Sequence, residues 1–385
     1  MILYYTFNSE ITGAMAKNIL VSTNLPPRVL AVGVYSPNNQ THNIDAYYQE
    51  FLNLIASNGV TPIATLFVKL RSIDPGYFIT SGKLEEILKI AQENSIEQIV
   101  FSERLSSRQE KNLADMLDCQ IFDRTQLILE IFEKGAHSAE GKIQVHLAML
   151  QNKKARLAGR GVDMSQQWGM IGMRGPGETE KEKETQHIEL LMNTLRRALK
   201  RLSKQRETQR KQRLANQVPH LCLIGYTNAG KSTVLNELTH AQVLAEDKLF
   251  ATLDTTTREL YVQKEKVGLL SDTVGFIQQL PTTLIEAFKS TLDELQYADL
   301  LLQIIDVSDS NFEAHIKVVG TILAELEVHK PMLFVFNKID KVVNIERLEP
   351  LLAKYQPHVI ISASSQEGIK PLSDYIFEWK QQLKN

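Results

Sequence analysis

The sequence predicts an α/β protein in three parts: a small amino-terminal α/β domain, an arm of two long antiparallel helices, and a carboxy-terminal α/β domain with a phosphate-binding loop. Short apolar segments alternate with helical ones before residue 123. Heptad-like apolar stripes follow, and a strand, Gly-rich loop and helix succeed one another from Leu221. A chain of 385 residues is long enough for two or three domains.

The composition is that of an ordinary globular protein, with 43% hydrophobic and 23% charged residues. No run of about 18 apolar residues is present, so no transmembrane helix is expected. The amino terminus lacks the basic start and apolar stretch of a secretory signal. Cys119 and Cys222 are the only cysteines and have no metal-binding spacing. We therefore expect a reduced, cytoplasmic protein.

Residues 1–27 show no clear periodicity. Either they are a poorly ordered extension, or the true start of the protein is Met15. Over 28–123, apolar strands are expected at 28–36, 61–71, 96–103 and 119–124, with helices at 47–59 and 81–95. In the second helix Leu84, Ile87 and Leu88 share one face. This alternation predicts a small α/β domain with a mostly parallel sheet.

The arm is expected over 124–215. Two apolar stripes with heptad-like spacing predict two long helices. The simplest arrangement is an antiparallel pair joined by a long loop. The stripes are Ile143, Leu147, Leu150 and Leu157, then Ile188, Leu191, Leu195 and Leu202. Between them, residues 159–179 are too rich in glycine for a helix. This loop is either a mobile connector or a docking tip, because it carries Trp168 and several methionines.

The second long helix ends in "LRRALKRLSKQRETQRKQRL", a basic segment in which Glu207 is the single acidic residue. One interpretation is a solvated helix face. The other is a nucleic-acid surface, because lysines and arginines without matching acids repel one another and a polyanion offsets that repulsion.

A phosphate-binding loop is predicted by "LCLIGYTNAGKSTVLNELT", in which Gly225, Gly230, Lys231 and Ser232 satisfy the pattern G-x-x-x-x-G-K-[ST]. The glycines let backbone N–H groups turn toward phosphate oxygens. Lys231 would reach the β- and γ-phosphates, and the Ser232 hydroxyl would bind Mg²⁺. The positive end of the following helix dipole adds to this attraction.

The base is indicated by "MLFVFNKID", which ends a strand at Asn337-Lys338-Ile339-Asp340. The Asp340 carboxylate can accept two hydrogen bonds from guanine N1–H and the 2-amino group, neither of which adenine offers. The Lys338 stem can lie along the base and Asn337 can brace the loop. The backbone N–H groups of residues 362–364 can meet guanine O6. Together these segments predict a Ras-like GTPase domain over 218–380.

The segment "SDTVGFIQQLP" lies between these motifs. Asp272 can hold the Mg²⁺ shell through water, and the Gly275 N–H can sense the γ-phosphate. In Ras-type enzymes a glutamine after this glycine orients the attacking water. Here the residue is Phe276, which cannot orient water, and Gln278 and Gln279 lie two and three residues further on. We expect slow hydrolysis by the free protein.

A first switch is expected in "LFATLDTTTREL", where one threonine should bind Mg²⁺ while GTP is bound and release it after hydrolysis. The residues alone do not choose among the candidates Thr252, Thr255, Thr256 and Thr257.

The set "GYTNAGKS", "FATLDTTTR", "DTVGFI" and "NKID", preceded by "GRG…RGPGETE" between helices, resembles the HflX family of GTPases. The resemblance covers nearly the whole chain from about Arg28. It implies that Thr252 is the Mg²⁺ ligand of the first switch and that an apolar residue takes the glutamine position, as Phe276 does. It also implies binding to the large ribosomal subunit and its RNA, and a role in splitting or rescuing ribosomes under stress.

With the motifs, this resemblance implies a site for Mg²⁺ with GTP or GDP. Lys231, Thr252 and Gly275 are expected to act in catalysis, and Ser232 and Thr252 to bind the metal. The residues expected to contact the nucleotide are Gly225, Tyr226, Thr227, Asn228, Ala229, Gly230, Lys231, Ser232, Phe250, Ala251, Thr252, Leu253, Asp254, Asp272, Thr273, Val274, Gly275, Asn337, Lys338, Ile339, Asp340, Ser362, Ala363 and Ser364.

Three functions stay open at this point. The preferred one is a monomeric, ribosome-stimulated GTPase that binds ribosomal RNA and not DNA. The second is a GTPase that assists ribosome assembly or RNA modification. The third is a nucleotide-gated switch whose arm binds a protein.

Overall fold

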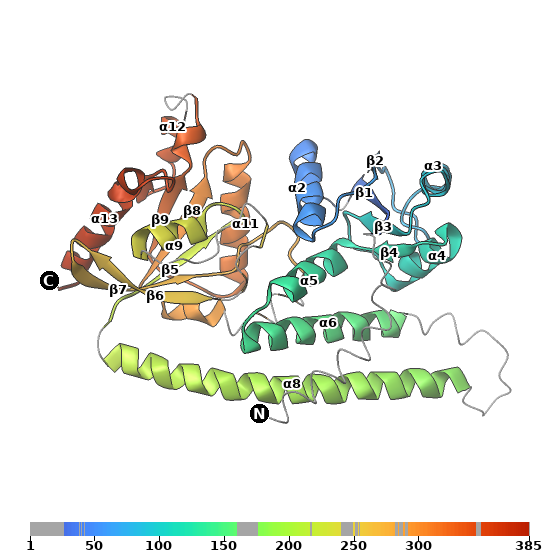
Figure 1. Cartoon of the computed structure of the whole chain (residues 1–385), viewed down its shortest axis with the longest axis horizontal. Coiled ribbons are helices and arrows are strands. Elements are labelled where there is room, and N and C mark those ends of the chain that lie inside the picture. The colour runs from blue at the N-terminus through green and yellow to red at the C-terminus, as the bar shows by residue number, and fades with distance from the viewer. Residues whose placement is uncertain are drawn as a thin grey trace.

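The computed structural model describes residues 27–37, 39, 41, 43–159, 176–215, 218–239, 249–250, 253, 255–281, 284, 288, 292–343 and 348–384. For residues 159, 176–180, 205–207, 209–215, 293 and 384 it describes the backbone alone. Figure 1 shows the three expected parts: an amino-terminal α/β domain, a carboxy-terminal α/β domain beside it, and a pair of long helices running beneath both.

The amino-terminal sheet has four parallel strands in the order β2-β1-β3-β4. The strands are β1 (Val29–Tyr35), β2 (Ala64–Lys69), β3 (Gln98–Phe101) and β4 (Gln120–Phe122). Each lies inside one of the apolar segments singled out in the sequence, so the prediction of a mostly parallel sheet is confirmed.

Helices cover both faces of this sheet. α2 (Ile44–Ser57) and α5 (Arg124–Gly135) share a core with one face of β1, through residues such as Val29, Phe51 and Ile128. α3 (Ser81–Glu93) and α4 (Ser107–Leu117) pack on the other face. The sequence analysis did not predict α4 or α5 as separate elements. Because α5 covers the sheet, the α/β layer extends past residue 123 to residue 135.

Both of these helices start at a capping box. In α4 the Ser106 side chain accepts from the Gln109 backbone while the Gln109 side chain accepts from Ser106 N–H. Asp123 and Gln126 make the same pair at the start of α5. Each box satisfies two backbone donors that a helix start otherwise leaves unpaired.

The arm consists of α6 (Ala139–Gly159) and α8 (Pro176–Ala215), which run antiparallel side by side in Figure 1. Their shared core contains Leu147, Leu150, Ile188, Met192 and Leu195. Ion pairs from Lys153 to Glu184 (2.9 Å) and from Lys154 to Glu189 (2.7 Å) join the exposed edges. All members of the two predicted apolar stripes except Leu202 therefore lie in or against this seam. Of the predicted Gly-rich loop, residues 160–175 lie outside the described residues, and residues 176–179 begin α8.

The arm packs on α5 through the buried residues Val145 and Ala148 of α6, and an arginine adds a charged contact to the amino-terminal domain. The Arg156 guanidinium near the end of α6 pairs with Glu110 at 2.5 Å and with the buried Asp123 at 3.1 Å. Because Asp123 also caps α5, this contact joins the arm, α4 and α5 at a single point.

The carboxy-terminal sheet has six strands in the order β10-β9-β8-β5-β7-β6, and only β6 runs antiparallel to its neighbour. The strands are β5 (His220–Gly225), β6 (Thr256–Val262), β7 (Glu265–Asp272), β8 (Leu300–Asp306), β9 (Met332–Asn337) and β10 (His358–Ile360). α9 (Lys231–Thr239) and α13 (Gln366–Lys384) share a core with one face. α11 (Phe312–Glu325) covers the other. Three short helical turns complete the described part: η1 (Asp293–Tyr297), η2 (Ile339–Lys341) and α12 (Glu349–Leu352).

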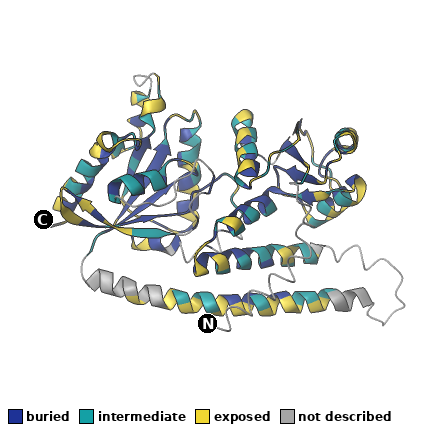
Figure 2. Cartoon of the chain, in the orientation of Figure 1, coloured by how far each residue is buried: buried dark blue, intermediate teal, exposed yellow. Residues whose placement is uncertain are grey.

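The two α/β domains share one apolar core. Phe132 of α5 lies with its ring centroid 4.7 Å from Phe250 and 5.2 Å from Phe288 of the carboxy-terminal domain. Full burial of one phenylalanine contributes about 1.5–3 kcal/mol. Figure 2 shows the buried residues concentrated in both sheets and on the inner helix faces. These packed rings fix the two domains against each other.

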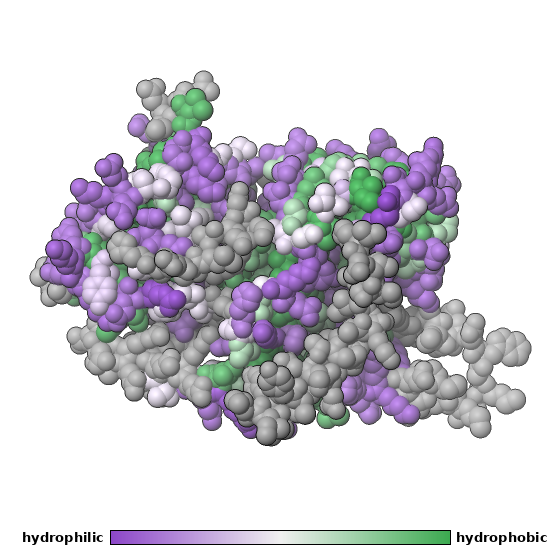
Figure 3. All heavy atoms as spheres, in the orientation of Figure 1, coloured by the Kyte–Doolittle hydropathy of each residue, from purple (hydrophilic) through white to green (hydrophobic). Residues whose placement is uncertain are grey.

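Hydrophilic side chains cover most of the described surface on the face shown in Figure 3. Among the described residues, no helix is both long and apolar enough to cross a membrane.

Candidate nucleotide-binding site

The Gly-rich loop follows β5 and leads into α9, as the sequence predicts. Gly225 has φ +150°, and a Cβ there would lie 2.3 Å from the Ile304 carbonyl oxygen of β8. No side chain fits so close to a neighbouring strand. The loop therefore needs glycine at this position in order to leave the sheet and turn toward the α9 amino terminus.

Lys231 is buried at the start of α9 and is only 6% exposed. Its ammonium donates to the carbonyl oxygens of Tyr226 at 2.8 Å and Gly225 at 3.3 Å, so its stem folds back over the loop. Burial is the main cause that lowers the pKa of Lys231 to about 8, while Asp272 acts in the opposite direction. A cation held inside the ring of loop residues is placed to meet phosphate oxygens.

Two oxygen-bearing side chains meet beside Lys231. The Ser232 hydroxyl donates to Asp272 Oδ2 at 2.7 Å, and Asp272, at the end of β7, is fully buried. The next residue, Thr273, is anchored by a hydrogen bond of 2.7 Å from its hydroxyl to the Leu223 carbonyl. Hydroxyl and carboxylate oxygens are the ligands that Mg²⁺ prefers. This pair therefore fits the metal that the sequence predicts.

Asn337 connects the phosphate side of the site to the base side. Its amide nitrogen donates to the Ala229 carbonyl at 2.9 Å, and its amide oxygen accepts from the Ala363 N–H at 3.0 Å. A Cβ on Gly230 would lie 2.4 Å from the same amide nitrogen, so this close approach requires glycine. The expectation that Asn337 braces the loop is confirmed.

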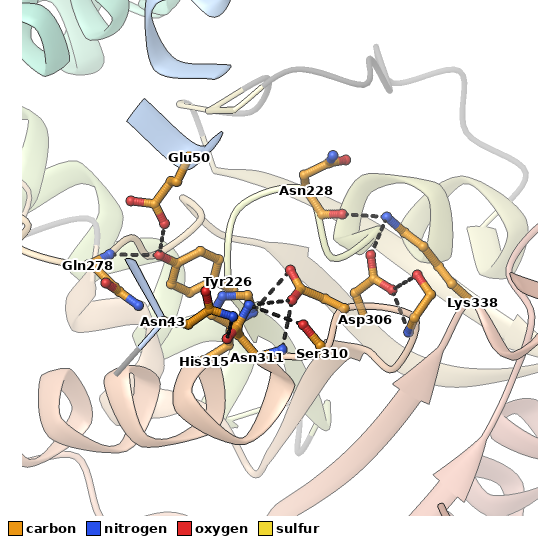
Figure 4. A network of polar contacts seen from close by, with 12 residues as sticks. Asn43, Glu50, Tyr226, Asn228, Gln278, Asp306, Ser310, Asn311, His315 and Lys338 are labelled. Carbon is orange, nitrogen blue, oxygen red and sulfur yellow. Dashed lines mark hydrogen bonds and ion pairs between the residues drawn. The ribbon is translucent and has the colours of Figure 1, made fainter. Parts of the chain in front are cut away.

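Lys338 makes two contacts that the sequence analysis did not predict. Its ammonium donates to the Asn228 carbonyl at 2.8 Å and pairs with Asp306 at 2.7 Å. Figure 4 shows this chain from Asn228 through Lys338 to Asp306. Asp306 ends β8, so an acidic residue at the end of the apolar run "LLLQIID" is the signal that could have found it.

The predicted base-reading carboxylate is oriented by serines. Asp340 Oδ1 accepts from the Ser362 hydroxyl at 2.5 Å, and Ser362 lies 2.7 Å from the Ser364 hydroxyl. The Ser362 N–H donates to Gly368 and the Ala363 N–H to Asn337. Two of the three backbone groups proposed for guanine O6 thus already have protein acceptors, and that contact stays a prediction.

Gly275 and Phe276 lie directly against the loop. A Cβ on Gly275 would be 2.8 Å from Thr227 Cγ2 and 3.0 Å from the Lys231 ammonium. Thr227 N–H donates to Phe276 O at 2.8 Å, and Phe276 N–H donates to Gly225 O at 3.1 Å. The Phe276 ring is 1% exposed and lies in the core shared by the two domains. The ring therefore points away from the phosphate-binding loop into an apolar core, where it cannot orient water.

The first switch is described only in part. Phe250 and Leu253 are buried in the shared core. Their side chains therefore face α5, and any contact with a nucleotide would come from their backbone. Ala251, Thr252 and Asp254 lie outside the described residues, so the proposed Thr252 ligand stays a prediction. Of the other candidate threonines, Thr256 and Thr257 belong to β6, and Thr257 is hydrogen-bonded to Ser271 at 2.7 Å.

The structure brings the remaining predicted residues together where β5, β7, β9 and β10 end. They are Gly225, Tyr226, Thr227, Asn228, Ala229, Gly230, Lys231, Ser232, Asp272, Thr273, Val274, Gly275, Asn337, Lys338, Ile339, Asp340, Ser362, Ala363 and Ser364. This edge, where parallel strands end, is the place at which open α/β sheets bind ligands.

Three family models match successive parts of the chain. Residues 45–133 match the GTP-binding GTPase N-terminal family, residues 135–213 the GTP-binding GTPase middle region, and residues 220–338 the 50S ribosome-binding GTPase family. The GTPase HflX of Caldanaerobacter subterraneus subsp. tengcongensis is 42% identical over 328 residues, covering 85% of this chain and 75% of that protein. The GTPase HflX of Escherichia coli K12 is 40% identical over 335 residues, covering 86% of this chain and 78% of that protein.

The chain belongs to the HflX GTPase family.

It is accordingly a GTP-binding GTPase, and the resemblance seen in its motifs is confirmed. Among solved structures, a crystal structure of the SsGBP and GDP complex aligns with a TM-score of 0.52 at 23% identity. It covers 93% of this chain and 100% of that chain, which supports the same fold. The site described above is therefore the candidate for GTP binding and hydrolysis.

Proposed function

We propose that this HflX-family GTPase is Mg²⁺-dependent, binds the large ribosomal subunit, and couples GTP binding and hydrolysis to ribosome splitting or rescue under stress. The observation that carries the proposal is the exposed basic face of α8, beside a guanine-nucleotide site in the same chain. The match of residues 220–338 to a family described as 50S ribosome-binding supports it.

The basic face consists of Arg196, Arg197, Lys200, Arg201 and Lys204, all of which are exposed. None of the five forms an ion pair within the part of the chain that the structure describes, whereas Lys153 and Lys154 on the facing helix do. Unneutralised cations on one helix favour a polyanionic partner over a merely solvated surface. RNA in the ribosome provides such a partner.

Five residues would act on the phosphates, either directly or through the metal. Ser232 would hold Mg²⁺ directly, with Asp272 holding its water shell and Thr252 as the proposed second protein ligand. When bound, the metal neutralises charge on the β- and γ-phosphates. Lys231 would bind the same phosphates. The Gly275 N–H would meet the γ-phosphate and so couple it to residues 275–281, which we call the second switch.

The same proposal places the protein in the cytoplasm as a monomer that binds RNA and not DNA. Both cysteines are free thiols, and Cys222 is buried, which suits a reducing compartment.

Replacing Arg196, Arg197, Lys200 and Arg201 together with Ala should flatten the salt dependence of ribosome binding. Each cation that neutralises a phosphate releases counterions, so loss of four contacts should reduce the slope of log K against log[salt] by about 3. GTP affinity should stay nearly unchanged, because these residues lie on the arm. The measurement is co-sedimentation with purified large subunits across a salt series.

A matched control removes four exposed lysines scattered outside the arm: Lys89, Lys111, Lys317 and Lys370. It changes the net charge by the same amount and should keep the wild-type slope. If the arm variant also keeps the wild-type slope, the basic run is only a solvated face.

Sedimentation and nuclease treatment distinguish ribosome splitting from the two alternative functions, which are ribosome assembly or RNA modification and protein binding. A splitting factor should convert joined ribosomes to subunits with GTP present, whereas an assembly or RNA-modification GTPase should leave them joined. If the arm instead binds a protein, RNase treatment of the captured complex should not release the partner. Either of these results would replace the splitting proposal.

A further inference from the structure

Three side chains at the junction of the two α/β domains converge on one backbone segment of the second switch. Glu50 comes from α2, Arg124 from the start of α5, and Tyr226 from the phosphate-binding loop. They meet at Gln278, two residues after Phe276. Figure 4 shows Glu50, Tyr226 and Gln278 pointing toward one another.

Both backbone polar groups of Gln278 are held by these side chains. The Gln278 N–H donates to the Tyr226 hydroxyl at 2.9 Å, and the Gln278 carbonyl accepts from Arg124 Nη2 at 3.1 Å. Glu50 links Tyr226 to Arg124. Its carboxylate accepts a hydrogen bond from the Tyr226 hydroxyl and another, of 2.5 Å, from Arg124 Nη2. The amino-terminal domain thus fixes a switch residue through one direct and one indirect contact.

The junction is buried and carries a paired charge. Arg124 is 2% exposed and Tyr226 is 6% exposed. Burial, followed by the neighbouring Glu50, raises the pKa of Tyr226 well above its ordinary value, so its hydroxyl keeps the proton that it donates. The Tyr226 ring also stacks on His315, with centroids 3.8 Å apart and planes at 11°. Hydrogen bonds between ionised groups in such surroundings are short and directional.

The fixed residue lies close to the reacting atoms along the chain. Gly275, whose N–H would meet the γ-phosphate, is three residues before Gln278. Phe276 between them is tied to the loop by the two backbone hydrogen bonds with Gly225 and Thr227. The segment 275–278 is therefore held at both ends, by the loop backbone at one and by Tyr226 and Arg124 at the other. A shift of about 1 Å in a reacting group can cost about 10²-fold in rate.

We propose that Glu50, Arg124 and Tyr226 are positioning residues for GTP hydrolysis, which hold the backbone of Gln278 and thereby place Gly275 against the phosphate. In this way the amino-terminal domain forms part of the hydrolytic site. The inference depends on the GTPase activity of the family and is independent of the ribosome.

Other contacts hold the domains together without touching Gln278. Asn43 Nδ2 donates to Asn311 Oδ1 at 3.0 Å, and the Leu249 N–H donates to the Ser57 hydroxyl at 3.0 Å. The Phe132, Phe250 and Phe288 rings add a buried apolar contact. The domains should therefore stay docked when the Tyr226 hydroxyl is removed, and a role in positioning can be told apart from a role in docking.

The test measures single-turnover GTP hydrolysis by the full chain without ribosomes, for Tyr226→Phe, Glu50→Gln and the double variant. Each single variant should hydrolyse GTP roughly tenfold more slowly, a smaller loss than that of a full 1 Å displacement. GTP and GDP affinity, followed with a fluorescent nucleotide, should stay within about twofold. The double variant should be no slower than the slower single variant, because the residues act as one unit.

Asn311→Ala is the matched control, since it removes an interdomain hydrogen bond that does not reach the switch. Its hydrolysis rate should stay near wild type. A wild-type rate in Tyr226→Phe would overturn the proposal. It would also be overturned if Asn311→Ala lost as much hydrolysis rate as Tyr226→Phe, or if Tyr226→Phe lost nucleotide affinity by the same factor as rate. The same holds if the rate losses of the two single variants multiply in the double variant. If Glu50→Gln fails to fold, Tyr226→Phe decides alone, because it removes one oxygen and keeps the stacked ring.

Discussion

Replacing Asp340 with Asn should weaken GTP binding by roughly 10²–10⁴-fold and shift the preference of the site toward xanthosine triphosphate. The carboxylate would accept two hydrogen bonds from guanine, and hydrogen bonds to charged groups contribute about 1.5–3 kcal/mol each. An amide offers one acceptor and one donor. Xanthine has a carbonyl where guanine has its 2-amino group, so the Asn donor would meet an acceptor there.

The fold should tolerate this change. Asp340 Oδ1 accepts from the Ser362 hydroxyl, and the amide oxygen of Asn can accept the same hydrogen bond. Calorimetric titration of GTP, xanthosine triphosphate and ATP would measure the shift, with Asp115→Asn on the exposed face of α4 as an isosteric control. Equal affinity of the wild-type protein for ATP and GTP would show that Asp340 does not read guanine.

The sequence predicts most of this site because its motifs are local. Lys231 and Ser232 follow a strand and begin a helix, and Asn337 and Asp340 follow another strand. Parallel strands end at one edge of a sheet, so these segments must meet there. The apolar stripes of the arm are also local signals, because the spacing of each stripe alone places its residues on one face of its own helix.

The features that the sequence did not predict depend on distant partners. The acidic end of β8 marks Asp306 as a candidate in the sequence, but its pairing with Lys338, which follows β9, depends on how these two strands lie side by side. Glu50 and Arg124 lie on amphipathic helices where one charged residue has no periodic signature. Their meeting with Tyr226 follows only from how the two domains pack. α4 and α5 differ from these, because their capping boxes were present in the sequence and could have revealed both helices.

Large ribosomal subunits should raise the rate of GTP hydrolysis by several orders of magnitude. Ras-type enzymes that keep the glutamine turn over at about 10⁻⁴ per second alone, and a partner can add roughly 10⁵-fold. Here the glutamine position holds Phe276, and its buried ring cannot orient a water. We expect the ribosome to supply the missing group directly or to hold the first switch closed.

Phe276→Gln should fail to restore fast turnover in the free protein. The backbone N–H and carbonyl of residue 276 are both hydrogen-bonded to the loop, which directs the side chain into the core shared with Phe288. A glutamine there would bury an unsatisfied amide at a cost of about 1–3 kcal/mol. Reduced thermal stability without a gain in rate is the expected result. A free variant that hydrolyses GTP as fast as the stimulated wild type would contradict this explanation.

The most direct test of a ribosome-dependent GTPase is single-turnover hydrolysis by the wild-type protein, free and saturated with purified large subunits. We expect a free rate near that of unaided Ras-type enzymes and a stimulated rate that approaches the range of about 5–20 per second seen with an activating partner. A free rate already near 1 per second, on that same scale, or no change on adding subunits, would show that the chain supplies its own catalytic group and that the ribosome is not its activator.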